Sequence, residues 1–294
     1  MPAVVTFTFD PVFRFSDTAS VRYETIALAI VLFIGLALGA RIGSKTPSVV
    51  PIVPAPGLRV DDLAFAIVGS VPGAILGGRL GYVLDHLDFY SANPAAIIDT
   101  AQGGLTLTLA VPFAILTGAA IARLLGAPVA RWMHAIALPL LFVLAAGKAV
   151  GVLGATGQGS PSDLAWATAY AGPGPWGSLA ADLPSHPSQV YEAILVGLAI
   201  VGVALASRLE VVARRDGAAL FVALGLWAAA RFVVAFTWRD PVVVGPLSAE
   251  QLQLLLVEVV AIAGFIQRRR APFLVPARPA SDEEPRIDVA ARLA

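Results

Sequence analysis

Apolar residues along the chain fall into long blocks that are separated by shorter polar segments. A helix that crosses the hydrocarbon core of a bilayer needs about 20 mostly apolar residues. Seven blocks are long enough, and Pro112 in the third is compatible with a membrane helix whose neighbours satisfy the freed carbonyl. The predicted spans are residues 24–42, 63–84, 105–123, 133–153, 189–206, 218–236 and 249–267. The pattern therefore predicts an all-α integral membrane protein with seven transmembrane helices.

Composition supports this class and excludes several others. Only 14% of the 294 residues are charged, whereas soluble domains contain about 25%. The net charge is zero, so no basic field favours nucleic acid. Cysteine is absent, which removes disulfides, thiol nucleophiles and thiolate metal sites. His86, His134 and His186 lie far apart, so we expect neither a metal site nor another cofactor.

The distribution of Lys and Arg predicts the orientation, because cytoplasmic loops are enriched in these residues. Loops 85–104 and 154–188 contain neither, and loop 237–248 contains Arg239 alone. Lys and Arg instead occupy loops 43–62, 124–132 and 207–217 and the tail from residue 268. We therefore expect the N-terminus outside and the C-terminus in the cytoplasm.

Three regions follow from this arrangement. Residues 1–23 lack the basic start and clean apolar run of a signal peptide, and are predicted to be an outer arm. Residues 24–267 form the membrane domain, including loop 154–188, whose Gly, Pro and Trp residues suit a periplasmic or extracellular cap. Residues 268–294 are Pro-rich and charged, which predicts a disordered cytoplasmic tail.

Three cations remain inside predicted spans that run outward. Arg79, Lys148 and Arg231 each lie five residues before the outer end of their span. A charge at the bilayer centre costs about 2.5–3.5 kcal/mol or more, so such residues indicate a functional site. Three cations at one depth predict an outward-opening cavity for a phospholipid phosphate, which guanidinium groups hold bidentately. The alternative is that each side chain reaches the headgroups independently.

Other residues near the outer face are open to two interpretations. Ser188 and Glu192 could serve chemistry, but helix capping explains them equally well. His186 could be a base or an interfacial hydrogen-bonding residue. The spacing of Gly73 and Gly77 around Arg79 favours close helix packing.

Several motifs, in order, resemble those of the bacterial prolipoprotein diacylglyceryl transferases over roughly residues 20–266. The strongest is "HPSQVYEA" at residues 186–193. The others are "GGRLGYVL" (77–84), "FYSANP" (89–94), "QGGL" (102–105), "ARFVVAFTWRDP" (230–241) and "LSAEQLQ" (247–253).

The resemblance implies a multi-pass protein of the bacterial plasma (inner) membrane. Such enzymes move the diacylglyceryl group of phosphatidylglycerol onto the lipobox cysteine of a preprolipoprotein, which they recognise by its signal peptide, and release glycerol phosphate. Combined with the reasoning above, it gives His186, Glu192 and Arg239 as catalytic candidates. The candidates for binding phosphate and lipid are Arg79, Lys148, Arg231, Tyr82, Gln189 and Tyr191.

The chain departs from the family pattern at two places. The family usually has His near Thr108 and a block like Arg-Ile-Gly-Asn-Phe-Ile-Asn-Gly-Glu after the fourth span. Here that block reads "KAVGVLGAT", which places Lys148, Gly151, Gly154 and Thr156 where Arg, Asn, Asn and Glu are expected.

These departures predict weak transfer activity, and they leave two other functions open. One is a catalytically inactive paralogue that binds anionic phospholipid or lipoprotein signal segments. The other is a transporter, which would be expected to open to both sides, whereas the charges inside the spans lie only near the outer face.

Overall fold

A computed structural model describes residues 4–16, 18–45, 59–99, 101, 103–213 and 215–270. In this part of the chain, seven helices are long and apolar enough to cross a membrane, as predicted. They are α1 (Tyr23–Lys45), α2 (Val60–Asp85), α4 (Leu107–Leu124), α5 (Val129–Val150), α6 (Ser188–Ala206), α8 (Ala218–Val234) and α9 (Ala249–Arg269). Two 3₁₀ turns, η2 (Gly151–Gly154) and η3 (Ala235–Thr237), continue α5 and α8.

Shorter elements connect the long helices. The helical ones are α3 (Leu87–Ala92), η1 (Pro94–Ile97) and α7 (Glu210–Ala213). The strands are β1 (Val5–Phe7), β2 (Val12–Arg14), β3 (Ser20–Arg22), β4 (Thr168–Tyr170), β5 (Val242–Val244) and β6 (Leu247–Ser248). β2 pairs antiparallel with β3 and β5 with β6, whereas β1 pairs parallel with β4. The all-α prediction missed these strands because strands of two or three residues carry too little alternation to be recognised.

The parallel pair joins the N-terminal arm to the loop between α5 and α6. Val5 lies opposite Thr168 and Phe7 opposite Tyr170. The ring of Phe7 stacks on that of Tyr170 with centroids 5.0 Å apart, and Trp176 packs against the same tyrosine. The segment predicted to be an outer arm therefore packs directly against the loop predicted to be a cap. The tail predicted to be disordered lies outside the described residues from position 271 onward.

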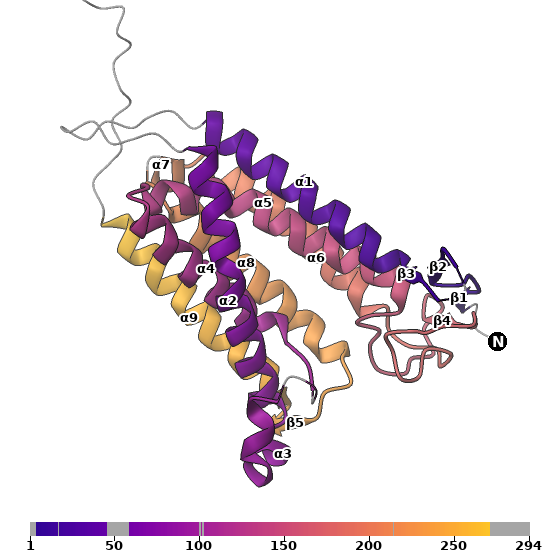
Figure 1. Cartoon of the computed structure of the whole chain (residues 1–294). Helices are drawn as coiled ribbons and strands as arrows, with labels where there is room; N and C mark the ends of the chain where they lie inside the picture. The colour runs from indigo at the N-terminus through magenta and orange to yellow at the C-terminus, as the bar shows by residue number, and fades with distance from the viewer. Residues whose placement is uncertain are drawn as a thin grey trace, which may run out of the picture.

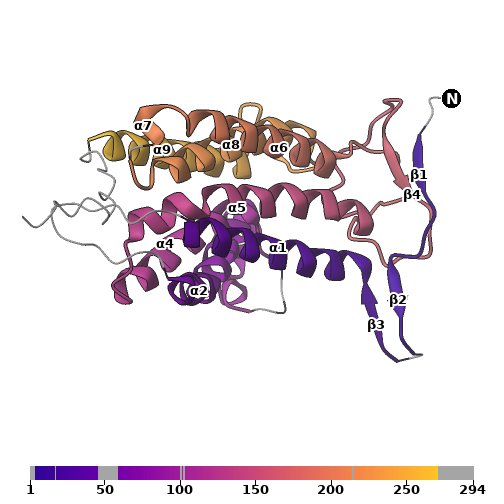
Figure 2. The same cartoon turned by 90° about the horizontal axis from the view of Figure 1, so that it is seen from above.

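Long helices pack side by side in a bundle (Figure 1). In Figure 2, α6, α8 and α9 lie on one side of α5, and α1 and α2 lie on the other. Apolar side chains of α5, α6, α8 and α9 form the main buried core, with Leu141, Val196, Trp227 and Leu254 at its centre. Large apolar side chains also cover the outside, including Phe33, Leu116, Leu198 and Val259, as expected for a surface that faces lipid.

Loops 85–104, 154–188 and 237–248 lie at the same end of the bundle. Figure 1 shows α3, β5 and the strands β1–β4 at this end and α7 at the opposite one. These three loops are the ones with few or no Lys and Arg, and the orientation inferred from that distribution stays a prediction.

Four glycines of α2 let this helix approach α4 closely. Gly69, Gly73, Gly77 and Gly81 recur every four residues and face α4. A Cβ at Gly77 would lie 2.4 Å from the carbonyl oxygen of Leu109, which is too close for any side chain. The predicted packing role of Gly73 and Gly77 is confirmed. The row of glycines that faces α4 is longer than expected, because it also includes Gly69 and Gly81.

Gly77→Ala should destabilise the bundle, because the methyl group would push against the backbone of α4. Overpacking of this kind costs about 1–3 kcal/mol, which thermal unfolding of the purified protein in detergent would detect. Gly197→Ala in α6 is the matched control, since nothing lies within 4 Å of a Cβ there. Equal melting temperatures for the two variants would contradict the close approach of α2 and α4.

Candidate active site

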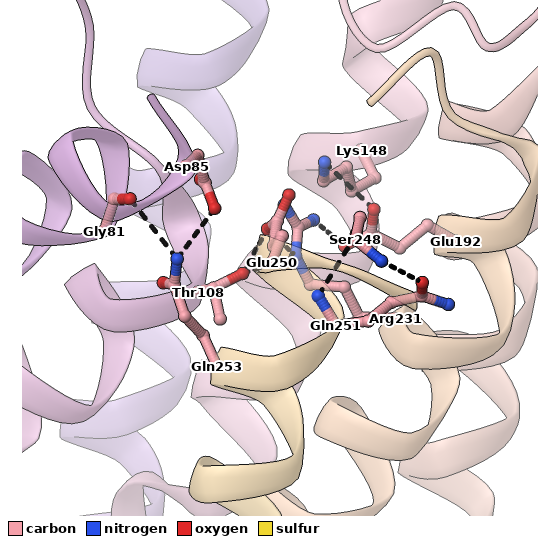
Figure 3. Close-up of polar contacts among 10 residues, drawn as sticks. All are labelled: Gly81, Asp85, Thr108, Lys148, Glu192, Arg231, Ser248, Glu250, Gln251 and Gln253. Atoms are coloured by element: carbon pink, nitrogen blue, oxygen red, sulfur yellow. Dashed lines mark hydrogen bonds and ion pairs between the residues drawn. The ribbon is translucent and has the colours of Figure 1, made fainter. Parts of the chain in front are cut away.

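A buried guanidinium lies at the centre of the polar residues inside the bundle (Figure 3). Arg231, near the end of α8, donates through Nη1 to Glu192 Oε1 at 2.6 Å. Its Nη2 donates to Glu250 Oε1 at 2.6 Å, and its Nε lies 3.0 Å from the same oxygen. The ring of Trp238 covers the guanidinium with its centroid 4.5 Å from Cζ, which is a favourable cation–π distance.

A second cation shares one of these carboxylates. Lys148, near the end of α5, places Nζ 2.9 Å from Glu192 Oε2, and its side chain is 23% exposed. Glu192 itself is buried on α6, and each of its oxygens faces a cation. A buried carboxylate is tolerated in this way because opposite charges and hydrogen bonds compensate for its lost hydration. Glu192 therefore holds the two cations together.

Glu250 completes the cluster from the start of α9. Ser248 and Gln251 form a capping box there, with Ser248 N–H donating to Gln251 Oε1 at 2.9 Å and Gln251 N–H donating to Ser248 Oγ at 3.3 Å. The box fixes the first turn, and a carboxylate in a first turn is favoured by the helix dipole. The hydroxyl of Thr108 on α4 accepts from Arg231 Nε at 3.2 Å and donates to Glu250 Oε1.

Beside this cluster, α2 is linked to α9 through Gln253. Its Nε2 donates to Asp85 Oδ1 at 2.7 Å and to the carbonyl of Gly81 at 3.3 Å (Figure 3). Side chains from α2, α4, α5, α6, α8 and α9 thus meet at one level.

Arg79 departs from the expected convergence. It has the same spacing from the end of its helix as Lys148 and Arg231. Its guanidinium, however, donates to the carbonyl oxygens of Ala96, Ile97 and Asp99 at 2.6, 2.8 and 3.0 Å. It also lies over the ring of Tyr90, 5.3 Å from its centroid. The prediction that three cations meet is correct for Lys148 and Arg231 and wrong for Arg79, because depth along a helix does not determine the direction of a side chain around it.

Tyr82 lies with this second group. Its ring stacks on His86 with centroids 4.2 Å apart, and the Arg79 guanidinium lies 5.9 Å from its centroid. Tyr82 and Arg79 therefore shape the end of α2 and the loop that follows it.

His186, Tyr191 and Arg239 lie in a third group, beside loop 154–188, which is named the cap loop after its predicted role. Arg239 Nε donates to the carbonyl of Gly159 at 2.7 Å, and its Nη2 donates to Ser185 Oγ at 3.0 Å. The Tyr191 hydroxyl accepts from Trp166 Nε1 at 2.7 Å, and its ring meets the His186 ring edge-on at 6.1 Å. These contacts fasten the cap loop to the beginning of α6 and the end of α8.

Gln189 connects α6 to the same cap. Its Nε2 donates to the Tyr170 hydroxyl at 3.3 Å. Burial raises the pKa of Tyr170 to about 12, so this phenol stays neutral at physiological pH. Both residues are buried, and the contact ties the first turn of α6 to β4.

Gly154, which departs from the family pattern, has its missing side chain replaced by residues from elsewhere in the chain. A Cβ at Gly154 would lie 2.0 Å from Glu24 Oε2 and 2.7 Å from Arg22 Nη2. Arg22 and Glu24 pair at 3.0 Å, and Arg22 also donates to the Gly154 carbonyl at 3.3 Å. The sequence motifs did not single out Glu24 or Glu250. The feature that could have identified them is a carboxylate in the first turn of an apolar helix, where a charge is unusual.

Removing the central guanidinium should be costly, because it leaves Glu192 and Glu250 buried without their shared partner. Truncating one member of a buried ion pair typically costs about 3–5 kcal/mol. Arg231→Met should therefore melt well below the wild type in detergent. Adding Glu250→Gln removes one of the uncompensated charges and should recover part of the loss. A double variant no more stable than Arg231→Met would argue against this pairing.

Comparisons with known proteins identify the family of this chain. The family model described as prolipoprotein diacylglyceryl transferase matches residues 12–267. The phosphatidylglycerol–prolipoprotein diacylglyceryl transferase of Geobacter sulfurreducens is 31% identical over 206 residues, which cover 66% of this chain and 74% of that protein. The protein of the same name from Gluconacetobacter diazotrophicus is 26% identical over 95% of this chain and 99% of its own length. This chain belongs to the prolipoprotein diacylglyceryl transferase family.

Proposed function

We propose that this protein transfers the diacylglyceryl group of phosphatidylglycerol to the lipobox cysteine of a preprolipoprotein, at the outer face of the bacterial inner membrane. The observation that carries the proposal is the pair of cations, Arg231 and Lys148, held together inside the membrane bundle by Glu192. Membership of a transferase family and a relative that matches over almost the whole chain favour this function over an inactive paralogue or a transporter.

The chemistry requires positive charge at this place. When the thiol sulfur attacks the glyceryl carbon, the bond from that carbon to the phosphate oxygen breaks and negative charge grows on the leaving phosphate. Fixed cations aimed at such charge are among the largest contributions to catalysis. In the cluster, Nη1 of Arg231 and Nζ of Lys148 lie against the two oxygens of the same carboxylate, so both cations are close enough to face one phosphate.

Other predicted site residues keep more peripheral roles in the proposal. Arg79 and Tyr82 would shape the lipid-facing end of α2, and Gln189 and Tyr191 the entrance beside the cap. Arg239 and His186 would act on the acceptor segment through the cap loop. In each case the support is the position of the residue at the end of the bundle that carries the cluster.

Expression in a conditional strain that lacks its own transferase tests the activity. The wild-type chain should restore lipoprotein maturation in part, because Lys148 offers a point charge where a guanidinium fork is expected. Lys148→Met should lower transfer about 10²–10³-fold, as loss of one fixed donor to developing charge does. Lys148→Arg should match or exceed the wild type.

Two outcomes of this experiment would contradict the expectations. Full rescue by the wild type would refute weak activity. Absence of rescue, with phosphatidylglycerol still bound by the purified protein, would support the lipid-binding paralogue instead.

The orientation can be tested directly because the chain contains no cysteine. Leu179→Cys, in the cap loop, should react with a membrane-impermeant thiol reagent in intact spheroplasts, since Leu179 is fully exposed. Ser44→Cys, at the opposite end of the bundle, should react only after the membrane is opened. The reverse pattern would invert the proposed topology.

A further inference from the structure

The two oxygens of Glu250 have different surroundings. Oε1 receives Nη2 and Nε of Arg231 at 2.6 and 3.0 Å and also the hydroxyl of Thr108. Within the described part of the chain, no hydrogen bond or ion pair reaches Oε2. Oε1 therefore holds the carboxylate in place, and the lone pairs of Oε2 remain available to accept a proton.

Glu192 differs in this respect although it belongs to the same cluster. Arg231 holds its Oε1 at 2.6 Å and Lys148 lies 2.9 Å from its Oε2. To accept a proton, Glu192 would have to give up one of two buried ion pairs, which is unfavourable. Glu250 can accept a proton on Oε2 while Oε1 stays bound to the guanidinium.

The transfer reaction needs such a group. A free cysteine thiol has a pKa of about 8.5 and is mostly protonated at neutral pH, whereas the thiolate is the nucleophile. Thr108 is no substitute, because a hydroxyl is not a base at neutral pH. His186 lies in the cap group, against Tyr191.

We propose that Glu250 is the general base that takes the proton from the acceptor thiol, with Thr108 as a positioning residue. The inference rests on the proposed transfer activity. The thiol proton moves to Glu250 Oε2, the sulfur forms a bond to the glyceryl carbon, and the bond from that carbon to the phosphate oxygen breaks. The electron pair of that bond goes to the phosphate, and the departing glycerol phosphate takes the proton from Glu250.

The surrounding structure suits this role. Arg231 contacts both the base and the proposed phosphate position, so a thiol beside Oε2 would lie next to the bound lipid. The capping box of α9 and the Thr108 hydroxyl restrict the carboxylate to one orientation, which is what efficient proton transfer requires. Thr108 stands near the place where the family resemblance implies an imidazole, so a carboxylate from α9 reaches the position of the missing base.

Charged groups around Glu250 come from several helices. Arg231 contacts it directly, and Glu192 and Lys148 follow beyond the guanidinium. Asp85 and Asp240 interact with it at longer range. Burial, reinforced by the nearby Glu250 carboxylate, raises the pKa of Asp240.

The test uses the purified full chain in vesicles that contain phosphatidylglycerol, with a lipobox peptide as acceptor. Transfer rate is measured from pH 6 to 9, and phosphatidylglycerol binding is measured in parallel. Glu250→Gln should lower the rate at pH 7 by about 10²–10⁴-fold, the usual contribution of a general base, while lipid binding is retained. Its residual rate should rise about tenfold per pH unit up to the thiol pKa of about 8.5, because only thiolate already in solution then reacts.

Two further variants sharpen the result. Glu258→Gln removes another carboxylate of α9 outside the cluster and should leave transfer unchanged. Glu250→Asp keeps the charge beside Arg231 but withdraws it by one methylene. The Glu250→Asp variant should lose up to about 10²-fold in transfer rate, as misplacement of a catalytic group by about 1 Å does. It replaces Glu250→Gln in the test if that variant does not fold.

Several outcomes would overturn the assignment. One is a Glu250→Gln or Glu250→Asp rate equal to that of the wild type. Another is a loss of the same size at every pH, or one accompanied by an equal loss of lipid binding, which would indicate a purely structural carboxylate. A wild-type chain inactive at every pH would instead refute the proposed transfer activity itself.

Discussion

The buried guanidinium of Arg231 is the group on which the arrangement of the helices depends. A charge removed from water is stable in a protein only where partners replace its hydration. Those partners come from α4, α6 and α9, and Glu192 extends the same network to Lys148 on α5. The helices that supply them must therefore end at matching heights and present particular faces to one another. Apolar packing between helices could be satisfied by several registers, whereas this network specifies one.

Prediction from the sequence succeeded where the signal is local. Hydropathy identified the seven spans, and glycine spacing indicated a close helix contact at Gly77. The depth of a cation follows from its position along a helix, so Lys148 and Arg231 were placed at one level. The direction of Arg79 could not be predicted, because it depends on how the segment after α3 folds back and offers its carbonyl oxygens.

Comparing single positions with a family pattern overstates how many functional groups a chain lacks. Thr108 and Gly154 have smaller side chains than the pattern implies, yet neither site is empty. Glu250 reaches Thr108 from α9, and Glu24 with Arg22 occupies the space beside Gly154. Each replacement comes from a segment more than 100 residues away in sequence, so only the three-dimensional arrangement reveals it.

The parallel pairing of β1 with β4 has a consequence for biogenesis. Val5 is synthesised well before its partner Thr168, which follows only after α1, α2, α4 and α5. Four helices separate the two strands, so once these helices span the bilayer both strands lie on the same side and can meet. The arm must therefore wait there, unpaired, until the fourth span is inserted. Such late closure of a distant contact is slow compared with local folding, and it makes the pairing of β1 with β4 a marker that the first four spans are inserted.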